Sequence, residues 1–112
     1  MNTVYVPQQP SKWDEKVGLW IPQIDMRNAA RYGDINIMFP PQASRVDFAQ
    51  VMEVMATKLA DFKSGDYLVA LGSPAMIAGA AMFIAKKNNG YLKLLTWDRI
   101  NKDYSVTEII TP

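Results

Sequence analysis

The side chains that most enzymes use for chemistry near neutral pH are missing from this chain. Its 112 residues include no histidine and no cysteine. Ser-His and Cys-His catalysis, zinc sites and disulfides are therefore excluded, since each depends on one of these two residue types. Carboxylate binding of Mg²⁺ or Ca²⁺ is the metal chemistry that remains open.

The acidic side chains do not form a recognisable catalytic or metal motif. The candidates are Asp14, Asp25, Asp34, Asp98 and Asp103. No two of them have the spacing of a known metal loop, and the EF-hand pattern is absent. Helix caps and turns explain them better than catalysis does, so we predict no catalytic residue, no metal site and no cofactor. The alternative is an enzyme that uses carboxylates and Mg²⁺.

One stretch has the pattern of an anion site. An apolar run at 67–71 meets Gly72-Ser73-Pro74, which begins a long helix-forming segment. This pattern predicts a buried strand that turns tightly into a helix, a junction where open α/β sheets often bind ligands. Ser73 and Pro74 are also an ordinary helix start, and the glycine-rich nucleotide fingerprints are absent. Helix capping and anion binding both remain open for this stretch.

Aromatic side chains offer a second kind of surface. Trp13 and Trp20 stand on the arms of a predicted hairpin around Gly18, and Trp97 and Tyr104 stand on the arms of another. Large aromatic residues dominate the energetics of protein–protein contacts. We predict these four aromatic residues as partner-binding; the alternative is that they pack the sheet edges and cover the hairpins.

Composition indicates an ordinary globular domain. Twelve basic and eleven acidic residues give a formal net charge of +1, so no overall charge favours nucleic acid or an anionic membrane. The N-terminus lacks the pattern of a signal peptide, and the longest apolar run, 75–85, is too short to span a membrane. We expect a cytoplasmic protein without a membrane segment.

The elements that position these residues alternate along the chain. The patterns predict strands at 3–6, 34–39, 67–71, 91–97 and 104–110, a hairpin at 12–22, and helices at 26–32, 46–62 and 74–88. Strand-helix-strand units give parallel sheets with right-handed crossovers. We predict an α/β fold: a small three-layer sandwich with a mixed sheet of four or five strands, a parallel β-α-β-α-β core and a C-terminal antiparallel hairpin. The chain is expected to be one domain, 1–112, in which 1–33 pack on a core of 34–112 and the first strand pairs at an edge.

Particular residues are expected to begin and end the helices. Asp25 is the predicted cap of the short helix and Gly33 its end. Ser44 is predicted to cap the helix at 46–62, whose buried face repeats at helical spacing: Phe48, Met52, Met55, Leu59 and Phe62. Gly79 lies inside the third helix, where its missing side chain permits another element to approach closely.

Three loops are expected at the carboxyl edge of the parallel strands. They bring together the predicted ligand-binding residues Ser44, Arg45, Gly72, Ser73, Asp98 and Arg99. Arg45 and Arg99 would add charge-assisted contacts to an anion. The ligand class would be a nucleotide or another phosphate-bearing molecule.

Several short motifs together resemble the small uncharacterised proteins of tailed-bacteriophage genomes. The segments that support this resemblance are spread over most of the chain: Val4-Tyr5-Val6-Pro7, Trp13-Asp14, Pro22-Gln23-Ile24-Asp25, Tyr32-Gly33-Asp34, Pro40-Pro41, 66–74 and 92–99. The resemblance brings no activity with it. It implies a protein made inside an infected bacterium.

Two functional hypotheses follow. The first is a non-enzymatic phage accessory protein that binds a host or phage protein, and that forms a homodimer through the 74–88 helix at Ala78, Gly79 or Met82. The alternative is a binding protein for a nucleotide or other phosphate ligand at the strand ends. Nucleic acid is not an expected partner, because the net charge is near zero.

Overall fold

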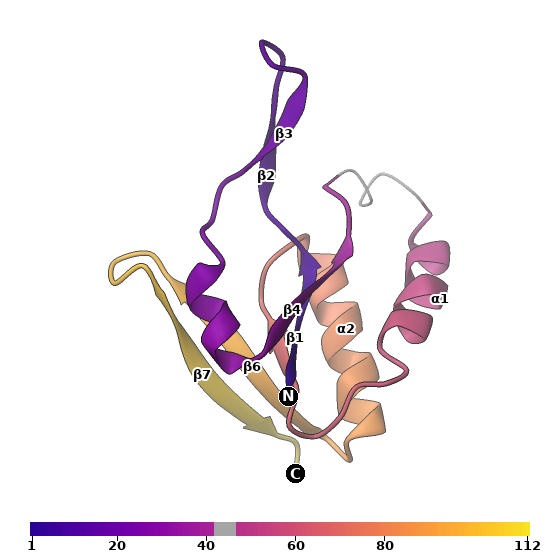
Figure 1. Ribbon diagram of the computed structural model, residues 1–112. Coiled ribbons are helices and arrows are strands. Elements are labelled where there is room, and N and C mark those ends of the chain that lie inside the picture. Colours follow the sequence, from indigo (N-terminus) through magenta and orange to yellow (C-terminus); the bar gives the residue numbers. More distant parts are fainter. Residues whose placement is uncertain (42–46) are drawn as a thin grey trace.

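A computed structural model describes residues 1–41 and 47–112 (Figure 1). The elements in chain order are β1 (Thr3–Gln8), β2 (Ser11–Asp14), β3 (Leu19–Pro22), the 3₁₀ helix η1 (Arg27–Tyr32), β4 (Asp34–Phe39), α1 (Phe48–Lys58), β5 (Tyr67–Val69), α2 (Pro74–Lys87), β6 (Tyr91–Asp98) and β7 (Asp103–Ile110). The predicted mixed α/β fold is confirmed, with its parallel core strands and its C-terminal antiparallel hairpin.

The large sheet has the strand order β4-β1-β5-β6-β7, and only β7 runs antiparallel to its neighbour. The expectation that the first strand lies at an edge is therefore wrong. Val4 and Tyr5 are buried on opposite faces of β1, as a strand covered on both sides requires. The predicted strand ends before Pro7, because proline is usually confined to edge strands and strand ends, whereas Pro7 is buried within β1.

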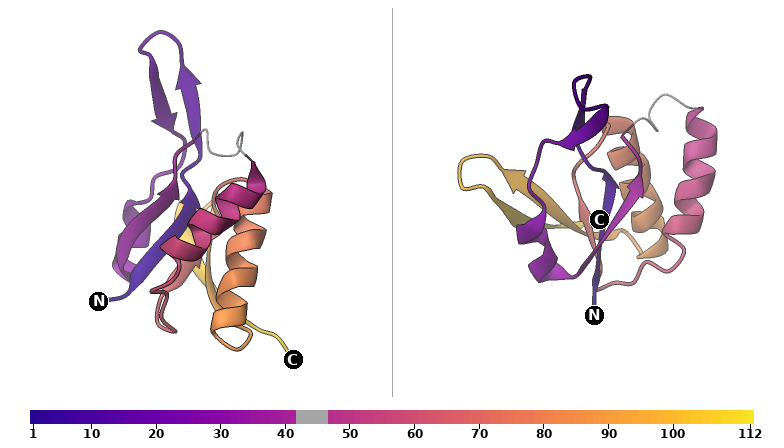
Figure 2. Two further views of the ribbon diagram at one scale, coloured as in Figure 1. Left: turned by 90° about the vertical axis from the view of Figure 1, so that its right-hand side faces the viewer. Right: turned by 45° about the horizontal axis from the view of Figure 1, so that its top comes forward.

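The direction of each crossover decides which face of the sheet each helix covers. The connections through α1 and α2 move along the sheet in one direction, from β4 towards β6, whereas the connection from β1 to β4 moves the opposite way. Right-handed crossovers then place α1 and α2 on one face and η1 on the other. Figures 1 and 2 show this arrangement, with helices, sheet and η1 as three layers.

Each face of the sheet has its own apolar core. Under α1 and α2, Tyr5, Leu68 and Leu92 pack with a set of buried helix residues, among them Met55, Met76 and Ile84. On the opposite face, Ala29 of η1 packs with sheet residues that include Val4, Val6, Val69 and Leu95. The sheet is thus buried on both sides over its central strands, and this double burial is the main source of stability in such a domain.

Helix α1 differs from its predicted bounds at both ends. It begins after Asp47, whose carboxylate accepts a hydrogen bond from the backbone N–H of Ala49 at 3.0 Å. The predicted cap, Ser44, and the neighbouring Arg45 lie outside the described residues. The helix ends at Lys58, four residues early, because the chain turns there, yet Leu59 and Phe62 remain buried in the turn.

Helix α2 confirms the predicted helix start. The hydroxyl of Ser73 accepts a hydrogen bond from the N–H of Met76 at 3.2 Å, and Pro74 occupies the first turn. The close approach expected at Gly79 is also found. A methyl group at Gly79 would lie 2.7 Å from Sδ of Met52 in α1, so the missing side chain lets the two helices pack.

Candidate functional site

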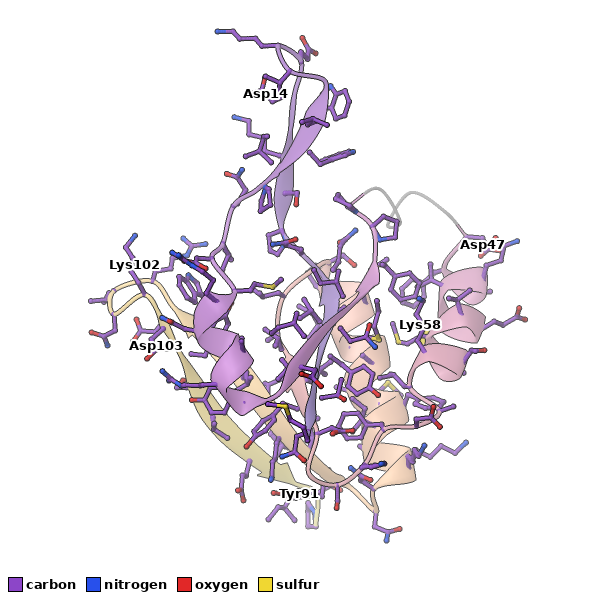
Figure 3. All side chains as sticks on the ribbon, viewed as in Figure 1. Asp14, Asp47, Lys58, Tyr91, Lys102 and Asp103 are labelled. Atoms are coloured by element: carbon purple, nitrogen blue, oxygen red, sulfur yellow. The ribbon has the colours of Figure 1, made fainter. Side chains whose placement is uncertain are left out.

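The β2–β3 hairpin projects from the body of the domain. Its strands form a two-stranded sheet of their own, separate from the large sheet (Figures 1 and 2). Asp14, near its tip, lies far from the rest of the molecule in Figure 3. An isolated two-stranded hairpin is only marginally stable in water. This element therefore needs local interactions to hold its shape.

The local interactions come from the turn, the aromatic pair and the base of the hairpin. The Asp14 carboxylate accepts a hydrogen bond from the N–H of Lys16, and Gly18 adopts a positive φ of 66° in the tight turn. Trp13 and Trp20 are directly opposite each other, with ring centroids 5.6 Å apart in an edge-to-face arrangement. Such a pair contributes about 0.5–1.5 kcal/mol. At the base, Gln23 donates its N–H to the carbonyl of Pro10 at 2.8 Å.

Both faces of the hairpin present apolar side chains to solvent. Two residues that pair across the strands project from the same face of the hairpin, and successive residues along a strand project from opposite faces. Trp13 and Trp20 therefore lie on one face, while Leu19 and Ile21 lie on the other. Trp13 is 46% exposed and Leu19 is 59% exposed, and Val17 is exposed at the tip. Apolar residues gathered on one projecting element are a typical feature of a surface that contacts another molecule.

The second predicted aromatic pair has a different environment. Trp97 and Tyr104 also face each other across two strands, with ring centroids 5.0 Å apart. Here the pair belongs to the core under η1, and Tyr104 is only 4% exposed. Its hydroxyl donates a hydrogen bond to the carbonyl of Asp25 at 3.3 Å. Burial, with a smaller effect from Asp25, raises the pKa of Tyr104 to about 12.

Polar contacts hold η1 against this second hairpin. Arg31 forms an ion pair of 3.0 Å with Asp103, and the side-chain amide of Asn28 donates to the carbonyl of Lys102 at 3.1 Å. Lys102 and Asp103 mark the turn beside η1 in Figure 3. The hydrogen bond from the Tyr104 N–H, and then that from Arg31, lower the pKa of Asp103. These contacts keep η1 over Trp97 and Tyr104.

Gln8 lies between the ends of β1 and β5 and, with Gly72, lines a small hollow of about 230 Å³. This is the point where connections leave the sheet in opposite directions, and open α/β sheets often bind ligands there. The side-chain amide of the buried Gln8 donates hydrogen bonds to the carbonyls of Pro40 and Pro41. Its backbone N–H donates to the carbonyl of Leu71. Gly72, with φ 124°, approaches so closely that a methyl group there would lie 2.9 Å from Cβ of Gln8.

A larger hollow lies beside the end of β6. Its volume is about 570 Å³, and it is lined by Pro10, Gln23, Ile24, Asp25, Trp97, Arg99 and Lys102. Asp25 is paired with Arg27 at 2.7 Å, whereas no ion pair involves Arg99 or Lys102 among the described residues. The hollow therefore combines two cationic side chains with the indole of Trp97.

The aspartates act in turns and at helix starts. The Asp98 carboxylate accepts hydrogen bonds from the N–H groups of Ile100 and Asn101 and from the Asn101 side chain, and these bonds lower its pKa. Asp25 accepts from the N–H of Arg27 just before η1, although Met26 occupies the N-cap position. Within residues 1–41 and 47–112, no three acidic side chains gather in a way that could hold a metal ion.

The outer face of α2 is open to solvent. Ala75 and Ala78 are exposed on it, and Met82 is 75% exposed. Gly79, in contrast, faces α1 and is buried in the packing with Met52. Of the three residues predicted for a dimer contact on this helix, Ala78 and Met82 are therefore accessible and Gly79 is not.

The predicted sites are thus brought together only in part. The four aromatic residues form two separate pairs rather than one surface. Gly72 and Arg99 line different hollows, which share Pro10 and Gln23 at the base of the hairpin. Sequence reasoning missed the exposed Leu19 and Ile21, although their alternation with Trp20 on one hairpin arm is the signal that reveals them. Lys102, which lies only three residues from Arg99, also lines the hollow, although it is not among the predicted ligand-binding residues.

Comparison with known proteins gives one family. Residues 2–111 match the family described as phage Pam3 gp32-like protein. No curated protein and no solved structure matches the chain. In the part of the chain that the structure describes, no helix has the length and apolar character needed to cross a membrane.

Proposed function

We propose that this chain, which belongs to the phage Pam3 gp32-like family, is a non-enzymatic accessory protein that binds a host or phage protein through its β2–β3 hairpin. The observation that carries the proposal is the aromatic pair on a projecting element, in which Trp13 is exposed and Trp20 is half-buried. The binding would take place inside the infected bacterium.

The energetics of the hairpin favour this reading over a purely structural role. Apolar residues on both of its faces contribute nothing to either core of the domain. Burying one such side chain against a partner would contribute about 1.5–3 kcal/mol. Two tryptophans on one face and two aliphatic residues on the other give each face of this hairpin apolar side chains of the kind that occupy the centre of protein interfaces.

The proposal can be tested by capturing partners from extracts of bacteria that produce the phage. Tagged wild-type protein should retain a defined host or phage protein, and the double variant Trp13→Ala/Trp20→Ala should lose at least about nine-tenths of it. Met82→Ala is the control, because it removes an exposed apolar side chain from α2 and should leave capture unchanged. Retention by the double variant would overturn the hairpin as the binding element.

The hollow beside Trp97 supports a second candidate function, the binding of a small anionic ligand with a planar ring, such as a mononucleotide. Its volume falls within the range of small-molecule sites. Trp97 offers a face for stacking, and Arg99 and Lys102 offer charge for a phosphate. The position, beside the carboxyl end of a parallel strand, is where such sheets commonly bind ligands.

A thermal-shift titration tests this second candidate. Mononucleotides should raise the melting temperature of the wild type, inorganic phosphate should raise it less, and Arg99→Ala/Lys102→Ala should abolish both shifts. Lys86→Ala/Lys87→Ala removes two basic residues from the far end of α2 and serves as the control. A flat response to every nucleotide would exclude the candidate while leaving the hairpin proposal intact.

A further inference from the structure

The outer edge of the large sheet, strand β7, has none of the usual protection against pairing with another strand. Every residue from Ser105 to Ile110 is exposed. Val106 is 43% exposed and Ile110 is 69% exposed. Proteins commonly shield such edges with proline, lysine or a bulge. This stretch has no proline and no lysine, and Glu108 is its only charged residue.

The pairing with β6 determines which backbone groups of β7 point outwards. The N–H of Thr111 donates to the carbonyl of Gly90 at 2.9 Å, in the same register as the strand pair. Hydrogen-bonded pairs alternate in an antiparallel ladder. Ser105, Thr107 and Ile109 therefore bond inwards to β6, and the backbone groups of Val106, Glu108 and Ile110 face the open edge.

Three further hydrogen bonds agree with this alternation. The same alternation places the backbone groups of Tyr104 on the open edge. Its N–H donates to the Asp103 carboxylate, and its carbonyl accepts a hydrogen bond from Arg31. On the inner strand, the carbonyl of Leu95, which faces Val106, accepts from Ala70 on the β5 side. The edge thus presents the donors and acceptors of Val106 and Glu108, while those of Tyr104 are already used.

We propose that a second copy of this chain pairs with this edge, with the two β7 strands antiparallel across a two-fold axis through Thr107. This register places Val106 opposite Glu108 of the other copy, so the free N–H and C=O groups of both residues find partners. The two five-stranded sheets would then form one continuous sheet. This interface is independent of the hairpin.

Two other symmetric registers are less favourable. An axis through Glu108 would set two carboxylates directly opposite each other, which is destabilising. An axis through Val106 would pair Glu108 with Tyr104, whose edge groups are occupied by Asp103 and Arg31. The register centred on Thr107 pairs Val106 with Glu108 on both sides of the axis and brings no like charges together, while Ile110 lies opposite the occupied groups of Tyr104.

Two lysine substitutions on adjacent residues test this geometry. Thr107→Lys places two lysines opposite each other at the axis and should weaken dimerisation at least about tenfold. Val106→Lys places a lysine opposite Glu108 of the other copy, so the dimer should be retained or tightened. Analytical ultracentrifugation of the full chain measures both variants against the wild type, and circular dichroism confirms that each is folded.

Amide hydrogen exchange on the wild-type protein provides a test without substitutions. The N–H groups of Val106 and Glu108 should become protected as protein concentration rises through the dimer range. A wild type that remains monomeric at millimolar concentration would overturn the proposal. So would a dimer that both lysine variants weaken equally, or one that only Met82→Lys on α2 disrupts.

Discussion

The two hairpins of this protein contain the same local motif in opposite environments. Each places two large aromatic rings directly opposite each other across antiparallel strands, Trp13 with Trp20 and Trp97 with Tyr104. The ring centroids are similarly spaced, at 5.6 and 5.0 Å. The first pair stands in solvent on a projecting element, and the second is covered by η1.

The difference between them comes from the packing rather than from the strands. The β6–β7 hairpin extends the large sheet and has η1 held over it by the Arg31–Asp103 pair and the Tyr104 hydroxyl. The β2–β3 hairpin has a turn and a base that fix its own shape, but no element among residues 1–41 and 47–112 covers it. A cross-strand aromatic pair is therefore structural in one place and available for binding in the other.

The largest expected effect is on stability. Tyr104→Ala should lower the free energy of unfolding by about 3–5 kcal/mol, because it removes a buried aromatic ring and leaves a cavity under η1. Trp13→Ala should lower it by about 0.5–1.5 kcal/mol, the contribution of the aromatic pair, because its ring is half exposed. Urea unfolding followed by circular dichroism measures both values. Equal losses in the two variants would mean that the hairpins are not distinguished by packing.

A smaller effect is expected from alkaline pH. The fold raises the pKa of Tyr104 from about 10 to about 12, so it favours the neutral phenol. The resulting stabilisation, about 3 kcal/mol, is complete below pH 10 and is lost as the pH rises from 10 to 12. Unfolding curves across this range should show a steeper decline for the wild type than for Tyr104→Phe, which cannot ionise. Parallel declines would show that Tyr104 is accessible to water.

The smallest effect concerns the ion pair beside η1. Arg31→Ala should cost less than about 1 kcal/mol, since both partners are partly exposed and an exposed pair contributes little. The difference from the wild type should shrink further in 1 M NaCl. A loss above about 2 kcal/mol would indicate that this pair, rather than apolar contact, positions η1.

Much of the fold could be predicted from residue patterns, because periodicity and turn residues reflect local geometry. The helix start at Ser73 and Pro74 and the end of η1 at Gly33 are examples. The central place of β1 was not predictable in this way, because Pro7 indicated the end of a strand. Strand order depends on long-range pairing, and no local pattern around Val4 or Tyr5 specifies the neighbours of β1.

The candidate sites were predictable only as residue types. The sequence pointed to four aromatic residues, but their separate environments depend on where η1 packs, and this follows from the crossover direction. Likewise, Gly72 and Arg99 were expected to line one site, because the loops that follow their strands were expected to lie side by side. The base of the hairpin, at Pro10 and Gln23, instead lies between the two hollows that they line.

Site-specific photocrosslinking tests the binding role of the β2–β3 hairpin most directly. A photoreactive amino acid is placed at Leu19 on this hairpin or, as the control, at Ile100 in the turn of the other hairpin, where the side chain is 90% exposed. In bacteria that produce the phage, position 19 should give one discrete crosslinked host or phage protein and position 100 should give none. No product from position 19, or the same products from both positions, would contradict the account.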